Sequence, residues 1–207
     1  MTAFEPRDRI IVVIRTDDAE AALAAARGVI EGGVGTVEIT LTVPGATEVL
    51  ERLRAAPALV GAGTVLDADR ARQAVAAGAR FLVAPDTNLD VLRAGRELGV
   101  PVVPGALTPT EIQSALRAGA AAVKVFPAGV LGGPSYIREL RGPLPDVPLV
   151  ISGGVTAQSA REYLAAGVTA VCLGREFLQT DHLAARDIPA IAARARSVLA
   201  TILGADS

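Results

Sequence analysis

The chain contains one lysine, Lys124, whereas the other 19 of its 20 basic residues are arginines. Lys124 lies in the middle of the apolar run 122–126, where a strand would bury it. A lysine in so arginine-rich a chain indicates a need for a primary amine that can lose its proton and attack a carbonyl. Burial favours the neutral, nucleophilic form of that amine. Two interpretations remain open on this residue alone: an amine nucleophile, or a structural lysine paired with a carboxylate.

Glu38 occupies a similar position in the segment 36–42. The alternation of a strand places Val37 and Ile39 on one face and Glu38 on the other. The valines on either side of Lys124 likewise face away from the lysine. The apolar faces must pack against a layer of helices. We therefore expect Glu38 and Lys124 to point together away from the helices, into the barrel that the strands enclose. There they form either an amine nucleophile with a general acid/base or a structural ion pair, which would be a poor source of stability.

Polar residues, glycines, prolines and one phenylalanine lie at the ends of the predicted strands. They come at the carboxyl ends, where barrel enzymes build their active sites. The residues in these positions are Arg15, Gly63, Thr64, Pro85, Asp86, Pro104, Gly105, Phe126, Pro127, Ser152, Gly153, Gly154, Gly174 and Arg175.

The last two strand ends form a second pattern. Ser152, Gly153 and Gly154 lead directly into a predicted helix, and Gly174 and Arg175 close the final strand. Glycines let backbone N–H groups approach an anion, and a helix N-terminus favours negative charge. Phosphate groups are often bound after strands seven and eight of a barrel. The pattern therefore predicts a phosphate site to which Arg175 adds a cation, although a tight turn without function would have the same sequence.

These residues are positioned by a repeated unit of helix, glycine and strand. Five alanine-rich stretches end in glycine and lead into short apolar runs, at Gly33, Gly78, Gly99, Gly119 and Gly167. Such glycines are typical of left-handed residues that close helices. We predict strands at 10–14, 36–40, 59–62, 81–85, 102–103, 122–126, 149–151 and 170–173. We predict helices near 18–31, 46–55, 67–77, 88–98, 108–118, 135–141, 156–166 and 186–202, with N-caps at Asp67, Asn88, Thr108 and Thr156.

Eight alternating units of about 26 residues predict a (β/α)8 barrel, a TIM barrel of the α/β class, formed by residues 1–207 as a single domain. The alternative is an open, doubly wound sheet. That fold more often has a glycine-rich turn directly after its first strand, whereas here the turn reads Arg15-Thr-Asp-Asp.

Composition excludes several other classes. With 51% hydrophobic residues and a net charge of −2, the chain is neither disordered nor a basic nucleic-acid binder. No charge-free run reaches the ~18 residues of a membrane span, and the N-terminus is polar, so we expect a soluble, cytoplasmic protein. The single cysteine, Cys172, is interpreted as a small buried hydrophobe, and one histidine, His182, cannot build a His-rich metal site. We therefore expect amine chemistry without a metal or other cofactor.

Four segments resemble motifs of the aldolases that act on 2-keto-3-deoxy-6-phosphogluconate (KDPG) and 4-hydroxy-2-oxoglutarate (KHG). They are 37–44, 61–65, 123–127 and 152–155. The resemblance covers nearly the whole chain in the right order. It implies a class I aldolase on a (β/α)8 barrel, usually a homotrimer, that binds a keto-deoxy sugar acid and pyruvate.

Residue by residue, the resemblance implies that Lys124 is the Schiff-base lysine and Glu38 the acid/base. It further implies that Arg15 and Thr64 hold the pyruvate carboxylate, that Pro85 and Phe126 line the pocket, and that Ser152, Gly153, Gly154 and Gly174 bind the substrate phosphate. This chain departs from the family at Thr42, where some members carry the carboxylate-binding arginine, and at Arg175-Glu176, where a serine is common.

Two other functions remain open at this point. One is a sugar-phosphate isomerase, epimerase or synthase, which would share the phosphate site but leave Lys124 unexplained. The other is a catalytically idle barrel that serves as an oligomeric scaffold.

Overall fold

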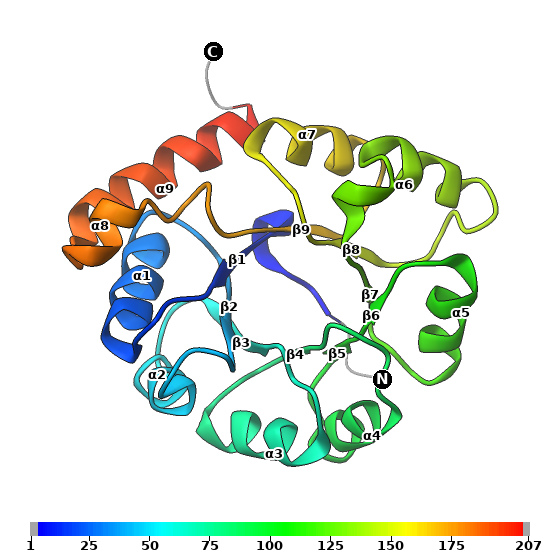
Figure 1. The fold of residues 1–207 in the computed structure, drawn as a ribbon, viewed down its shortest axis with the longest axis horizontal. Helices are drawn as coiled ribbons and strands as arrows, with labels where there is room; N and C mark the ends of the chain where they lie inside the picture. Colours follow the sequence, from blue (N-terminus) through cyan, green and yellow to red (C-terminus); the bar gives the residue numbers. More distant parts are fainter. Residues whose placement is uncertain (1–3, 205–207) are drawn as a thin grey trace.

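The computed structural model describes residues 4–204, and the ends of the predicted domain at 1–3 and 205–207 lie outside this range. The described chain forms one parallel sheet surrounded by a ring of helices (Figure 1). The strands are β1 (Ile10–Ile14), β2 (Thr36–Thr40), β3 (Leu59–Gly63), β4 (Leu82–Val83), β5 (Val102–Val103), β6 (Gly105–Ala106), β7 (Val123–Val125), β8 (Leu149–Ile151) and β9 (Ala170–Leu173).

The sheet closes on itself at Pro104. Its strand order is β5-β4-β3-β2-β1-β9-β8-β7-β6, and its two end strands, β5 and β6, are separated in sequence by this one residue. Proline has no N–H group to donate to a sheet ladder, so the fifth strand ends at Val103, as predicted, and an additional short strand, β6, follows Pro104. The Pro104 carbonyl still accepts a hydrogen bond from the Lys124 backbone N–H at 2.8 Å. The predicted (β/α)8 barrel is therefore confirmed, with the short strand β6 in addition.

The helices follow the predicted order, and three short elements are added, one of which is a 3-10 turn at Arg7–Arg9 before β1. The helices are α1 (Ala19–Glu31), α2 (Ala46–Arg52), α3 (Ala68–Ala77), α4 (Leu89–Glu97), α5 (Pro109–Arg117), α6 (Pro134–Arg141), α7 (Ala157–Ala165), α8 (Thr180–Ala184) and α9 (Ile188–Leu203). The short helix α8 and a 3-10 turn at Ala128–Leu131 are additional to the prediction, because neither is long enough to show a hydrophobic period. Both follow strand ends near the candidate site.

Local signals in the sequence were reliable. The side chains of all four predicted N-caps accept backbone hydrogen bonds, and Thr108 forms the capping box with Glu111. The five predicted glycines all have positive φ, between 70° and 115°. These caps set where each helix ends and therefore where each strand enters the barrel.

The strands separate two apolar clusters, as the alternation predicts. Val37, Ile39, Val123 and Val125 belong to the larger cluster, between the sheet and the helices. The smaller cluster fills the barrel interior and consists of Phe4, Ile11, Phe81, Val83, Val103, Ala122, Val150, Ala170 and Cys172. Glu38 and Lys124 consequently point inward.

The amino end of the barrel is closed by the N-terminal segment, which crosses the middle of the ring in Figure 1. The Phe4 and Phe81 rings pack with their centroids 5.1 Å apart. The Arg7 backbone N–H donates to the Thr36 hydroxyl at 2.8 Å, at the start of β2. This end of the barrel is a packed core. No helix within residues 4–204 is long and apolar enough to cross a membrane.

Candidate active site

Glu38 and Lys124 are the only charged residues in the buried part of the described chain. Glu38 is 4% exposed at the centre of β2, and Lys124 is 7% exposed at the centre of β7. Within residues 4–204, neither side chain forms a hydrogen bond or an ion pair within 4 Å. A buried charge without a close partner is costly, so two of them facing one interior indicate a site built for a ligand.

The electrostatic environment of Glu38 favours its protonated form. Burial raises the pKa of the Glu38 carboxyl above its ordinary value of 4.5, while the positive charges of Lys124 and Arg15 lower the pKa by less. The three side chains therefore interact through the barrel interior. A raised pKa makes a carboxyl a stronger base and keeps it protonated to higher pH, which suits a group that must both accept and donate a proton.

Phe126 lies beside the lysine. The Lys124 Nζ atom is 5.1 Å from the centroid of the Phe126 ring, and Phe126 remains 40% exposed. A Cβ atom on Gly153 would lie 3.2 Å from the same ring. The structure thus brings the predicted lysine, the predicted pocket wall and the predicted phosphate loop together.

A cavity of about 810 Å³ opens at the carboxyl ends of β1, β8 and β9. The predicted site residues that line it are Arg15, Ser152, Gly153, Gly154, Gly174 and Arg175. Glu176, which the sequence marks as a departure from the family, also lines the cavity, and sequence reasoning missed the far wall, which includes Leu178, Thr180 and Leu183. Thr180 and Leu183 come from helix α8, which was not predicted and gave no periodic signal.

Cys172 connects this cavity to the buried pair. It lines the cavity, and the thiol interacts electrostatically with Glu38 and Lys124. Burial raises the pKa of the Cys172 thiol far above its ordinary value, the charge of Glu38 raises it further, and Lys124 and a hydrogen bond from Ser152 lower it. Cys172 is a buried small residue, as predicted, but it also belongs to the site. The same alternation that placed Glu38 inward places residue 172 inward.

Thr64 is held in an unusual backbone conformation. Its φ is +58°, a value that β-branched residues rarely adopt. Such strain, on the order of 1–2 kcal/mol, is concentrated at functional sites in proteins. Thr64 directly follows β3, next to the strand that carries Glu38. Pro85 follows β4 at the same end of the barrel, with its carbonyl oxygen packed against Gly105. Thr64 and Pro85 thus lie at the carboxyl end of the barrel, which we call the mouth. Neither residue lines the large cavity.

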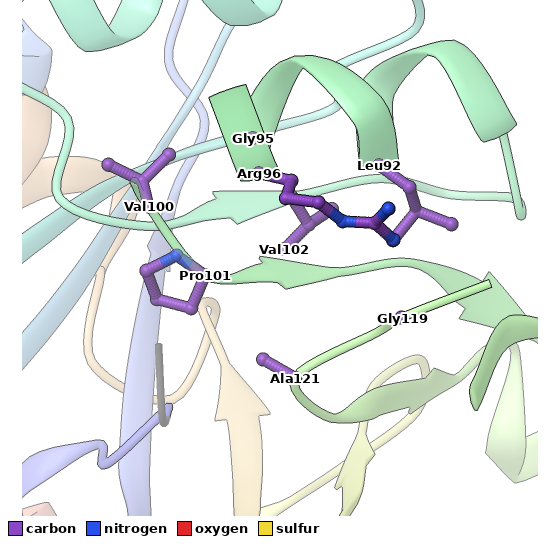
Figure 2. Close-up of a pocket in the computed structure, with 8 residues that line it drawn as sticks. All are labelled: Leu92, Gly95, Arg96, Val100, Pro101, Val102, Gly119 and Ala121. Atoms are coloured by element: carbon purple, nitrogen blue, oxygen red, sulfur yellow. The ribbon is translucent and has the colours of Figure 1, made fainter. Parts of the chain in front are cut away.

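A second cavity, of about 410 Å³, lies at the opposite end of the strands. Figure 2 shows it between helix α4 and the segments that enter β5 and β7, with Arg96 as its charged residue. None of the predicted site residues lines it. Within the described residues, no group of three or more His, Cys, Asp or Glu side chains is placed to hold a metal ion.

Comparison with known proteins identifies the family. The family model for KDPG and KHG aldolases matches residues 5–194. The 2-dehydro-3-deoxy-phosphogluconate aldolase of Treponema pallidum is 36% identical over 96% of this chain and 97% of its own length.

Two solved structures have the same fold. The KDPG aldolase of Legionella pneumophila, captured with pyruvate as a covalent carbinolamine intermediate, has a TM-score of 0.84 and 30% identity over 92% of this chain and 93% of its own. A cube-shaped cage designed by fusing symmetric oligomeric domains has a TM-score of 0.84 and 31% identity over 96% of this chain and 73% of its own.

Proposed function

Because the chain belongs to the KDPG and KHG aldolase family, we propose that it is a class I aldolase that cleaves KDPG to pyruvate and glyceraldehyde 3-phosphate. Cleavage of KHG to pyruvate and glyoxylate is a second reaction of the same site. The observation that carries the proposal is the pair of buried, unbonded charges, Lys124 and Glu38, at the base of the mouth. An isomerase or an idle scaffold would leave this pair without a use.

In the proposed reaction, the neutral amine of Lys124 attacks the C2 ketone, and loss of water gives an iminium. Glu38 removes the proton of the C4 hydroxyl, directly or through a water molecule. The C3–C4 bond then breaks, its electrons form an enamine with the iminium, and the aldehyde leaves. Glu38 returns a proton to C3, and hydrolysis of the new iminium releases pyruvate. The raised pKa of Glu38 suits a group that must accept and donate in one cycle.

Substrate binding uses the residues around this pair. Arg15 and Thr64 hold the pyruvate carboxylate, and Phe126 and Pro85 form the wall of the pocket. The backbone of Ser152, Gly153, Gly154 and Gly174 binds the distal phosphate at the start of α7, where the helix dipole favours an anion. Arg175 adds a positive charge to this end of the cavity.

Cleavage kinetics test the proposal. We expect wild-type protein to release pyruvate from KDPG with a higher kcat/KM than from KHG, which has no phosphate. Arg175→Ser should reduce kcat/KM for KDPG about tenfold, the value of one charge-assisted hydrogen bond, and leave KHG cleavage within twofold. Failure to cleave either substrate would contradict the proposed activity. An equal loss on both substrates would contradict the role of Arg175.

The oligomeric state is proposed to be a homotrimer. Exposed apolar side chains support an assembly, and several lie near the mouth: Leu66, Leu89, Val130 and Leu131. The similarity to a cage built from symmetric oligomeric domains supports it as well. Light scattering should give three times the chain mass of 21.1 kDa, and a monomer would contradict the proposal. A cytoplasmic location stays a prediction from the sequence.

A further inference from the structure

The Glu38 carboxyl does not lie at the level of its own strand position. The Cα atom of Glu38 pairs with Val13 on one side and with Gly61 on the other. The side chain instead reaches Gly63, two residues further toward the mouth. A Cβ atom on Gly63 would lie 1.8 Å from Glu38 Oε1 and 2.4 Å from Cδ. The carboxyl therefore occupies the space that any side chain at position 63 would need.

We propose that Gly63 is a positioning residue for Glu38, because its missing side chain leaves the slot that holds the acid/base carboxyl at the mouth. The inference rests on the proposed role of Glu38 in proton transfer. Gly63 is the second glycine of the segment 61–65. Its proposed function is to leave room for a neighbouring side chain and not to form a turn.

The backbone at Gly63 does not itself require glycine. Its φ lies outside the left-handed region, so an alanine could adopt it without strain. The strand is also fixed in place, since Gly63 pairs with Thr40 and its carbonyl accepts the Leu41 N–H at 2.8 Å. An added methyl group cannot be accommodated by moving the strand away. The contact that excludes a side chain is the Glu38 carboxyl.

Gly61 provides a matched comparison on the same strand and the same face. A Cβ atom there would lie 2.4 Å from the Phe81 ring, a clash of similar size with an apolar neighbour. The two glycines thus leave room for two different groups. Gly61 makes room for the Phe81 ring of the core, and Gly63 makes room for the carboxyl of Glu38.

The first test is Gly63→Ala, measured by exchange of the C3 hydrogens of pyruvate for deuterium in D2O. This exchange needs both the enamine on Lys124 and proton transfer by Glu38. Displacement of a catalytic group by about 1 Å costs on the order of 100-fold in rate. We expect exchange and kcat to fall by about that factor, while borohydride still traps pyruvate on Lys124 to the wild-type extent. Gly61→Ala should lower Tm but keep the exchange rate of the folded protein.

The second test repeats Gly63→Ala in the Glu38→Asp background, whose carboxyl is one methylene shorter. There the added methyl group has less to displace, so we expect it to change the exchange rate by less than threefold. Wild-type exchange in Gly63→Ala, or the same loss in both backgrounds, would overturn the inference. If Gly63→Ala does not fold, recovery of folding in the Glu38→Asp background supports the slot, and no recovery overturns it. Absence of any adduct in wild-type protein would instead refute the proposed aldolase activity.

Discussion

The two ends of the barrel are built from the same strands but have opposite properties. At the amino end, Phe4 packs on Phe81 and the N-terminal segment is hydrogen-bonded to Thr36. At the carboxyl end, Glu38 and Lys124 are buried without bonded partners, and Thr64 adopts a strained conformation. One strand, β2, has both properties, with a satisfied polar group at its start and an unsatisfied charge at its centre. The amino end of the barrel is a satisfied, packed core, and the groups suited to chemistry lie at the carboxyl end.

The largest expected effect comes from the mouth. Lys124→Arg keeps the positive charge but removes the amine that forms the Schiff base, so turnover should fall by about 10⁴-fold or more, as for loss of other covalent nucleophiles. The measurement is pyruvate release from KDPG, with circular dichroism to confirm folding. Activity within tenfold of wild type would break the assignment of chemistry to this lysine.

Glu38→Gln should lower kcat by about 10²- to 10⁴-fold, the usual contribution of a general acid/base. Its effect on stability should have the opposite sign. Because burial raises the pKa of Glu38, the folded state favours the protonated carboxyl, and stability is lost as pH rises from 4.5 through the raised pKa. Glutamine does not ionise, so the variant should gain stability relative to wild type over that pH range. Thermal melts at pH 4 and pH 8 measure this difference, and a relative loss at pH 8 would refute it.

Phe4→Ala probes the amino end. Removing a buried aromatic ring costs about 3 kcal/mol, which corresponds to a fall in Tm of roughly 6–12 °C for a chain of this size. The kcat of the folded protein should stay within twofold of wild type, since the ring lies away from the mouth. A large loss of kcat with an unchanged Tm would reverse the division between the two ends.

The smallest expected effects concern residues with positive φ, one at each end of the barrel. Thr64→Gly should relieve strain and raise Tm by about 2–4 °C, for a gain of about 1 kcal/mol, while the KM for pyruvate exchange rises about tenfold. At the other end, Gly167 has a φ of +80° with no atom within 4 Å of an added Cβ. Gly167→Ala should therefore lower Tm by a similar amount and leave KM unchanged. Shifts of the same sign in both variants would contradict the idea that Thr64 stores backbone strain that Gly167 does not.

Much of the fold could be predicted because its signals are local. The left-handed glycines, the N-caps and the alternation around Glu38 and Lys124 each depend on a few neighbouring residues, and all of them were confirmed. The break at Pro104 was not predicted as the point of closure, because it lies between β5 and β6, which are the two ends of the strand order around the barrel.

The parts of the site that were missed depend on contacts between distant segments. Helix α8 is too short to show a period, yet Thr180 and Leu183 form the far wall of the cavity. The space that a side chain at Gly63 would need is occupied by the carboxyl of Glu38, 25 positions earlier in the chain. No local pattern encodes either contact. The individual roles of Arg15, Thr64, Pro85 and Arg175 stay predictions until ligands are bound.

The central claim is that Lys124 forms a Schiff base inside the barrel. The most direct test is incubation of the protein with pyruvate and sodium borohydride, followed by intact-mass spectrometry and peptide mapping. We predict a mass gain of one reduced pyruvate per chain, located on Lys124 and absent from Lys124→Arg. A folded protein that gains no mass, or that carries the adduct elsewhere, would contradict the claim.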